Sequence, residues 1–205
     1  MKEKLENKIT DLIFHIRLTN QLSDSILNYF SMSVGLFFYG CRYAKLDFAK
    51  DTESLIYEII FICGIIQIIL SIYDWYKGKS LTLFSNITFG LLFISWYYKY
   101  KKVLLLDPAH KDNKYEGIIY ILFAVITITM LIASKNRGIM YAINYLALLV
   151  AFAFMIVDKY AKKNSWTKQT FGYAFVVSGG LFWITGLMRL LNSQFLNRSF
   201  ILVKE

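Results

Sequence analysis

Two long apolar runs separated by a short polar hinge constrain this chain more than any other feature. Residues 54–98 read SLIYEIIFICGIIQIILSIYDWYKGKSLTLFSNITFGLLFISWYY, and the hinge between the runs is DWYKGK at 74–79. Each run approaches the roughly 20 apolar residues that an α-helix needs to cross a bilayer. The pattern predicts two spanning helices joined at a tight hinge that contains Asp74 and Gly78, with Lys77 and Lys79 beside the carboxylate.

Four further apolar runs of similar length lie in the rest of the chain. We expect six spanning helices, at about 26–44, 54–75, 80–98, 116–134, 138–158 and 170–191. Because the runs are continuous and do not alternate with polar residues, they predict helices and not a β-barrel. The predicted fold is an all-α integral membrane protein, a six-transmembrane-helix bundle.

The expected organisation has three parts. A polar, amphipathic N-terminal segment covers 1–20, the six-helix transmembrane domain covers 21–192, and a C-terminal tail covers 193–205. In the first segment, apolar residues recur at helical spacing between charges, which is typical of a helix lying on a membrane surface.

The basic residues of this chain lie mostly in short clusters between the apolar runs. The net charge is +9, which in a soluble protein would suggest nucleic acid as a partner. Clusters such as Lys99, Lys101 and Lys102 are instead placed to contact anionic lipid headgroups. We therefore expect membrane lipid as a partner and no nucleic acid. As a separate expectation, the protein is assigned to the plasma membrane.

A few polar side chains lie inside the apolar runs, where burial without a partner is costly and where function is a default hypothesis. Gln67 could bond a neighbouring helix or contact a bound solute, and its position favours neither. For Asn86 and Asn144 the interhelical bond is the favoured interpretation. Glu58 lies near its helix end, where it reaches headgroup water or serves as a protonatable group.

No pattern in the chain points to catalysis. His15 and His110 stand in no metal-ligand spacing, and there is no glycine-rich phosphate loop. Cys41 and Cys63 lie in or beside apolar runs and are expected to be packing residues. We expect no enzyme activity, no metal site and no cofactor.

The hinge block resembles the acetate uptake transporter family, whose bacterial members include succinate–acetate permeases. The family pattern G-x-x-Q-x-x-x-G-x-x-E-x-x-x-G is matched by Gly64, Gln67 and Gly78, with Ser71 and Asp74 replacing Gly and Glu. A Phe-Gly pair at 89–90 falls where the family has Tyr-Gly. NSQF and RS within residues 192–199 are similar to the family ending N-E-Q-F-G-R-T. The chain is identified as a divergent member.

The resemblance implies a homohexamer in which each six-helix protomer has its own pathway. It places a hydrophobic constriction of that pathway at Phe30, Phe89 and Leu148. The other residues expected to line or bind along the pathway are Gly64, Gln67, Asn86 and Gly90.

The implied function is a membrane transporter or channel for acetate-like small monocarboxylates, with succinate as a further substrate and with proton coupling. Apolar rings can pass the methyl end of such an acid while amides hold the carboxylate. Protonation lowers the cost of crossing a dry gate, because an unpaired buried carboxylate is expensive. The expected partners are therefore the small carboxylate and protons.

An alternative is a non-transporting membrane protein that keeps the fold as a sensor, scaffold or assembly subunit. The family motif N-P-A-P-L-G-L at the first helix is QLSDSIL at 21–27 here, without proline. A continuous polar-lined path would favour transport, whereas a core filled by packed side chains would favour the alternative.

Overall fold

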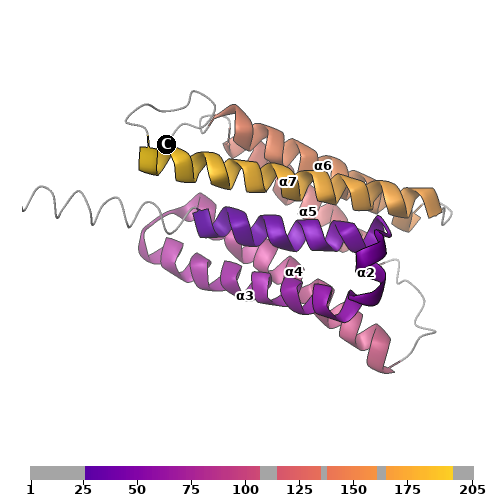
Figure 1. Ribbon diagram of the computed structural model, residues 1–205. Helices are drawn as coiled ribbons and strands as arrows, with labels where there is room; N and C mark the ends of the chain where they lie inside the picture. The colour runs from indigo at the N-terminus through magenta and orange to yellow at the C-terminus, as the bar shows by residue number, and fades with distance from the viewer. Residues whose placement is uncertain (1–25, 107–114, 135–137, 161–164, 196–205) are drawn as a thin grey trace, which may run out of the picture.

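The computed structural model describes residues 26–106, 115–134, 138–160 and 165–195. These residues form helices and short turns, and no strand occurs among them. In chain order the elements are a helix over 26–43, then α2 (Asp47–Asp51), α3 (Glu53–Tyr76), α4 (Ser80–Leu106), α5 (Tyr115–Ala133), α6 (Ile139–Tyr160) and α7 (Ser165–Phe195), as drawn in Figure 1. The predicted N-terminal segment 1–20 lies outside the described residues.

Each predicted apolar run becomes a helix, with bounds that agree to within a few residues for four of the six. The exceptions are α4, which continues past the predicted end at 98, and α7, which begins before 170 and remains helical to Phe195. The long helices lie side by side and reverse direction at each connection (Figure 1).

Four of the described helices are long and apolar enough to cross a bilayer, which makes this an integral membrane protein of the helical class. They are Glu53–Tyr76, Ser80–Lys102, Ile139–Tyr160 and Trp166–Leu191. The apolar part of α5, Gly117–Ala133, is shorter, and the 26–43 helix is not among the four. Six membrane spans therefore remain a prediction.

The hinge between α3 and α4 is closed by a Schellman turn. The Lys79 N–H donates to the Asp74 carbonyl at 2.9 Å, and the Gly78 N–H donates to the Trp75 carbonyl at 3.0 Å. Gly78 has φ +69°, the left-handed conformation that glycine adopts without the steric cost of a Cβ atom. The tight hinge predicted around Gly78 is thus explained by its backbone conformation.

The 26–43 helix lies between the α3–α4 pair and α7 (Figure 1). Its Ser33 hydroxyl donates to the Gly179 carbonyl of α7 at 2.7 Å, and its Gly35 faces the ring of Phe93 on α4. Small residues let neighbouring helices approach closely in a membrane, where interhelical contacts depend on packing. This helix thereby joins the two halves of the bundle.

The outer surface of the bundle is apolar along much of its length. On α3 the exposed large side chains include Leu55, Ile62, Ile65, Ile69 and Ile72. Glu58 also lies toward this surface, where Lys101 Nζ on α4 is 3.1 Å from its Oε1. Of the two interpretations of Glu58, this half-exposed position favours the one in which the side chain reaches headgroup water.

Candidate functional site

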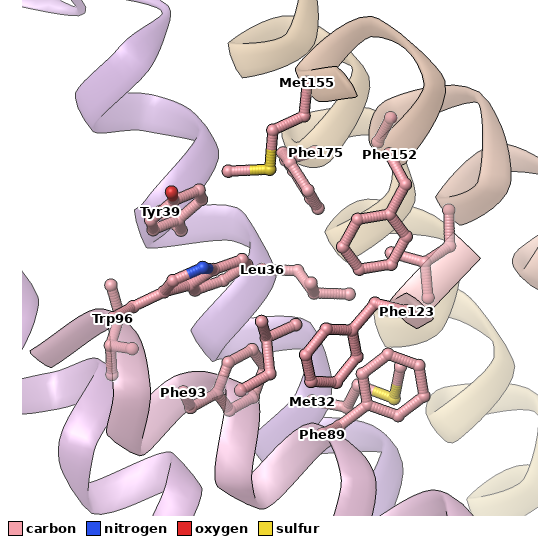
Figure 2. Packing of buried hydrophobic residues seen from close by; sticks show 14 of the residues in the cluster. Met32, Leu36, Tyr39, Phe89, Phe93, Trp96, Phe123, Phe152, Met155 and Phe175 are labelled. Carbon is pink, nitrogen blue, oxygen red and sulfur yellow. The ribbon is translucent and has the colours of Figure 1, made fainter. Parts of the chain in front are cut away.

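Aromatic side chains from five helices meet in the middle of the bundle (Figure 2). Tyr39 stacks on Trp96 with ring centroids 3.5 Å apart, and Phe175 meets the edge or face of both rings. Phe152 contacts Phe175 at 5.6 Å. We call this group the aromatic plug, made up of Tyr39, Phe89, Phe93, Trp96, Phe123, Phe152 and Phe175, all of them buried. These rings fill part of the interior of the bundle with apolar side chains.

The three residues predicted to form a constriction differ in how deeply the structure buries them. Phe89 and Leu148 are fully buried and belong to the same interior cluster. Phe30 is half-buried, and its ring lies 4.6 Å from that of Trp183 on α7, beside Gly186. Two of the three thus lie in the buried interior, and the third lies against α7. The constriction itself stays a prediction.

Gln67 joins α3 to the 26–43 helix. Its Nε2 donates to the Asn28 carbonyl at 3.0 Å and to the Ser31 hydroxyl at 2.6 Å. The Gln67 side chain is fully buried, and Asn28 and Ser31 are nearly so. The interhelical bond that the sequence left as one of two alternatives is therefore present. The Gln67 Oε1 atom remains without a hydrogen-bond partner among the described residues, so a solute contact is compatible with it.

Asp74 and Asn86 form a second interhelical contact at the hinge. Asn86 Nδ2 donates to Asp74 Oδ2 at 2.7 Å, and both side chains are buried. The sequence placed this carboxylate near the hinge lysines, and in the structure it also accepts a hydrogen bond from Asn86 of α4. A charge-assisted bond of this kind fixes the start of α4 relative to the end of α3.

Asn144 provides the third contact, between α6 and α7. Its Nδ2 donates to the Thr185 hydroxyl at 2.8 Å, and that hydroxyl donates to the Leu181 carbonyl at 2.9 Å. Asn144 and Thr185 are fully buried. The sequence favoured an interhelical role for Asn144, and the structure has this bond.

The side-chain amides of Asn28, Gln67, Asn86 and Asn144 share one property, and we call them the amide layer. In each, the side-chain carbonyl oxygen is buried and accepts no hydrogen bond from the described residues. Leaving such an acceptor without a donor costs about 1–3 kcal/mol. The four oxygens are therefore suited to accept hydrogen bonds from water or from a small solute.

The amide layer lies on one side of the aromatic plug. We call the end of the bundle at the α3–α4 turn the hinge end; the 26–43 helix, α4 and α6 all begin there (Figure 1). On α4, Asn86 precedes the buried Phe89 by three residues, and on α6, Asn144 precedes Leu148 by four. One helical turn is 3.6 residues, so each amide lies one turn nearer the hinge end than an apolar core residue.

Gly64 and Gly90 occupy a close crossing of α3 and α4. A Cβ atom on Gly64 would lie 3.0 Å from the Gly90 carbonyl oxygen, and one on Gly90 would lie equally close to the Gly64 oxygen. Both glycines therefore serve helix packing in this structure. Their predicted contribution to a pathway is not tested by this contact.

Sequence reasoning did not single out Asn28, Ser31 or Thr185 as members of the site. Their signal is helical spacing: Asn28 stands four residues before the buried Met32, and Thr185 three residues after the buried Phe182. Among the described residues, no three His, Cys, Asp or Glu side chains are grouped as metal ligands.

The fold is similar to that of a known membrane channel. A solved structure titled "Structure of the bacterial acetate channel SatP" aligns with a TM-score of 0.73, covering 88% of this chain and 97% of that one at 17% sequence identity. The chain has an acetate-channel-like fold. No family model matches the sequence, and no curated protein does. The resemblance inferred from the hinge block is thus confirmed at the level of the fold, and the low identity marks the chain as divergent.

Proposed function

We propose that this protein is a membrane channel or transporter for acetate-like small monocarboxylates. The observation that carries the proposal is the amide layer, which places buried polar acceptors next to an apolar plug inside the bundle. The similarity to a bacterial acetate channel over most of both chains supports it. The constriction residues Phe89 and Leu148 and the pathway residues Gln67 and Asn86 take their proposed roles from this arrangement.

The chemistry of a small carboxylic acid fits the two layers. An apolar methyl group can pass between rings that exclude hydrated ions. A protonated carboxyl group carries an O–H donor, and the amide layer offers carbonyl oxygens to accept it. Since an unpaired carboxylate is costly to bury, we propose that acid and proton cross together. Succinate would cross by the same route after protonation.

The outer surface supports a membrane assembly. The exposed apolar side chains of α3 and α5 are suited to lipid or to a neighbouring protomer. We propose a homohexamer in the plasma membrane, each protomer with its own pathway. Native mass spectrometry from membranes tests the copy number, and a monomer would contradict the assembly without affecting the transport proposal.

Uptake of labelled acetate into proteoliposomes tests the function. We expect saturable uptake that rises when the outside is made more acidic than the inside, because protonation favours passage through the plug. Liposomes without protein provide the control for diffusion of the neutral acid. If no acid of one to four carbons shows saturable or gradient-sensitive flux above that control, the proposal fails.

A second candidate function is a non-transporting membrane protein that keeps this fold. The aromatic plug favours it, because packed rings fill the middle of the bundle. The uptake experiment separates the two candidates, provided that the reconstituted protein is folded and inserted.

A further inference from the structure

Arg189 lies on the inward-facing stripe of α7. The stripe runs through Ser178, Phe182 and Thr185, which are all buried, and reaches Arg189 one turn beyond Thr185. The outward side of the same turns carries Trp183, Leu187 and Leu191, whose side chains are exposed. The arginine thus stands at the hinge end of α7, on the side that faces the other helices.

Two tyrosine rings hold the guanidinium group of Arg189. Its Cζ atom lies 5.5 Å from the ring centroid of Tyr29 and 5.2 Å from that of Tyr141. The two rings meet edge to face with centroids 5.8 Å apart, and Tyr141 is buried. Cation–π contacts hold the group by its charge and leave N–H donors available for hydrogen bonds.

No carboxylate among the described residues forms an ion pair with Arg189, whereas Arg42 at the other end of the bundle pairs with Glu53 at 2.6 Å. A guanidinium group binds a carboxylate through two parallel N–H···O bonds, which is stronger and more specific than a bond to a neutral acceptor. Arg189 therefore offers a positive charge that no carboxylate of the described residues matches, in a position set by two aromatic rings.

Arg189, Tyr29 and Tyr141 each lie within about one helical turn, along the chain, of a residue in the amide layer or its hydrogen-bond partner. Thr185, one turn before Arg189, accepts the bond from Asn144. Tyr141 stands three residues before Asn144, and Tyr29 follows Asn28 in the 26–43 helix. An anion held by Arg189 would lie about one helical turn from the contact between Asn144 and Thr185.

We propose that Arg189, with Tyr29 and Tyr141, forms a binding site for a small carboxylate anion at the hinge end of the pathway. This inference rests on the proposed function and deepens it: the anion is captured here and then passes to the amide layer. The phosphate of a lipid headgroup has the same oxyanion chemistry, but the inward stripe and the tyrosine contacts favour a solute inside the bundle.

Binding of ¹³C-labelled acetate, measured by NMR on protein in phosphate-free maltoside micelles, tests the site without requiring transport. We expect Arg189→Gln to weaken binding about tenfold or more, as loss of charge-assisted hydrogen bonds implies. Arg189→Lys should retain part of the affinity, because it keeps the charge but loses the planar pair of donors. Lys168→Gln, at the other end of α7, is the charge-matched control and should bind as wild type does.

The outcomes separate the two proposals and the two sources of anion. Equal acetate binding by wild type and Arg189→Gln, or no binding by wild type, overturns the site. If a short-chain phosphatidylglycerol at equal concentration displaces acetate, Arg189 is assigned to lipid, and the proposed solute site is likewise overturned. In proteoliposomes, we expect Arg189→Gln to raise the half-saturating acetate concentration with little change in maximal rate. Arg189-dependent binding without any flux in wild type would retain the site and reject the transport function.

Protein folding is checked for each variant by size-exclusion elution and thermal melting. Should Arg189→Gln fail to fold, the comparison of Arg189→Lys with wild type decides: unchanged acetate affinity overturns the site, and a severalfold loss supports it.

Discussion

At the scale of the residue, this protein has side-chain amides in the interior of a membrane bundle, where hydrogen-bond partners are few. Each of Gln67, Asn86 and Asn144 uses its N–H donors to join two helices, and each has a buried carbonyl oxygen that accepts no hydrogen bond within the described part of the chain. If such a residue served only to join two helices, its carbonyl oxygen would be expected to accept a hydrogen bond as well. Because these carbonyl oxygens accept no hydrogen bond from the described residues, they can also bind a solute.

Gln67→Ala tests this use. We expect acetate uptake to fall about fivefold, the equivalent of about 1 kcal/mol, because one acceptor and two hydrogen bonds to the 26–43 helix are lost. Proteoliposome uptake measures the effect. Thr129→Ala is the control, since Thr129 is exposed on α5 and its hydroxyl donates to the Val125 carbonyl of its own helix. Wild-type uptake by Gln67→Ala would remove Gln67 from the pathway.

At the scale of the element, the α3–α4 pair is held at three levels. The Schellman turn at Gly78 closes the hinge, the Asp74–Asn86 bond lies just inside it, and Gly64 meets Gly90 further along. Residues of two different helices can approach this closely only where neither has a side chain at the crossing. The pair therefore behaves as one preformed unit on which the 26–43 helix packs.

Gly64→Ala should destabilise this unit by about 1–3 kcal/mol, because the new methyl group would overpack the crossing against the Gly90 carbonyl and the Ile94 backbone. Thermal melting of the detergent-solubilised protein measures the loss. Gly180→Ala on α7 is the matched control: a Cβ atom there meets nothing within 4 Å, and alanine is the better helix former. Equal melting temperatures for the two variants would contradict the close crossing.

At the scale of the whole molecule, a polar layer and an aromatic plug are stacked along the axis of the bundle. The 26–43 helix contributes to both, through Asn28 and Tyr39, and it contacts α3, α4 and α7. Bulky rings from five helices then pack against one another along roughly two turns of α4, from Phe89 to Trp96 (Figure 2). In such an arrangement, selectivity among solutes depends on the size of the gap between the rings. Side chains from several helices set that size together.

Phe89→Ala should widen that gap and raise uptake of butyrate relative to acetate. The ratio of the two uptake rates in proteoliposomes measures the change. Phe84→Ala is the matched control, because Phe84 is on the same helix with an exposed side chain. Removing a buried ring costs about 3–5 kcal/mol, so Phe89→Leu is tested beside it as the milder variant. An unchanged butyrate-to-acetate ratio in both Phe89 variants would show that this ring does not set selectivity.

Much of the fold could be predicted because it follows from local sequence. The apolar runs predicted the helices around 54–75 and 80–98, and DWYKGK predicted the hinge where Gly78 adopts a positive φ. The number of membrane spans was harder to predict from the sequence. Four of the described helices qualify as spans by length and composition, and the 26–43 helix and α5 are not among them. α5 has 19 residues, close to the roughly 20 that a spanning helix needs, so run length alone does not decide whether such a helix crosses.

By itself, the sequence determined the class of this protein, an all-helical membrane bundle, since run length and hydropathy act within each segment. Only the tertiary structure decided the partners. It joined Gln67 to Asn28, turned Asp74 toward Asn86, and set Phe30 against Trp183 apart from the buried cluster of Phe89 and Leu148. The rotation of each helix about its axis decides such contacts, and that rotation is set by the packing of side chains from distant parts of the chain.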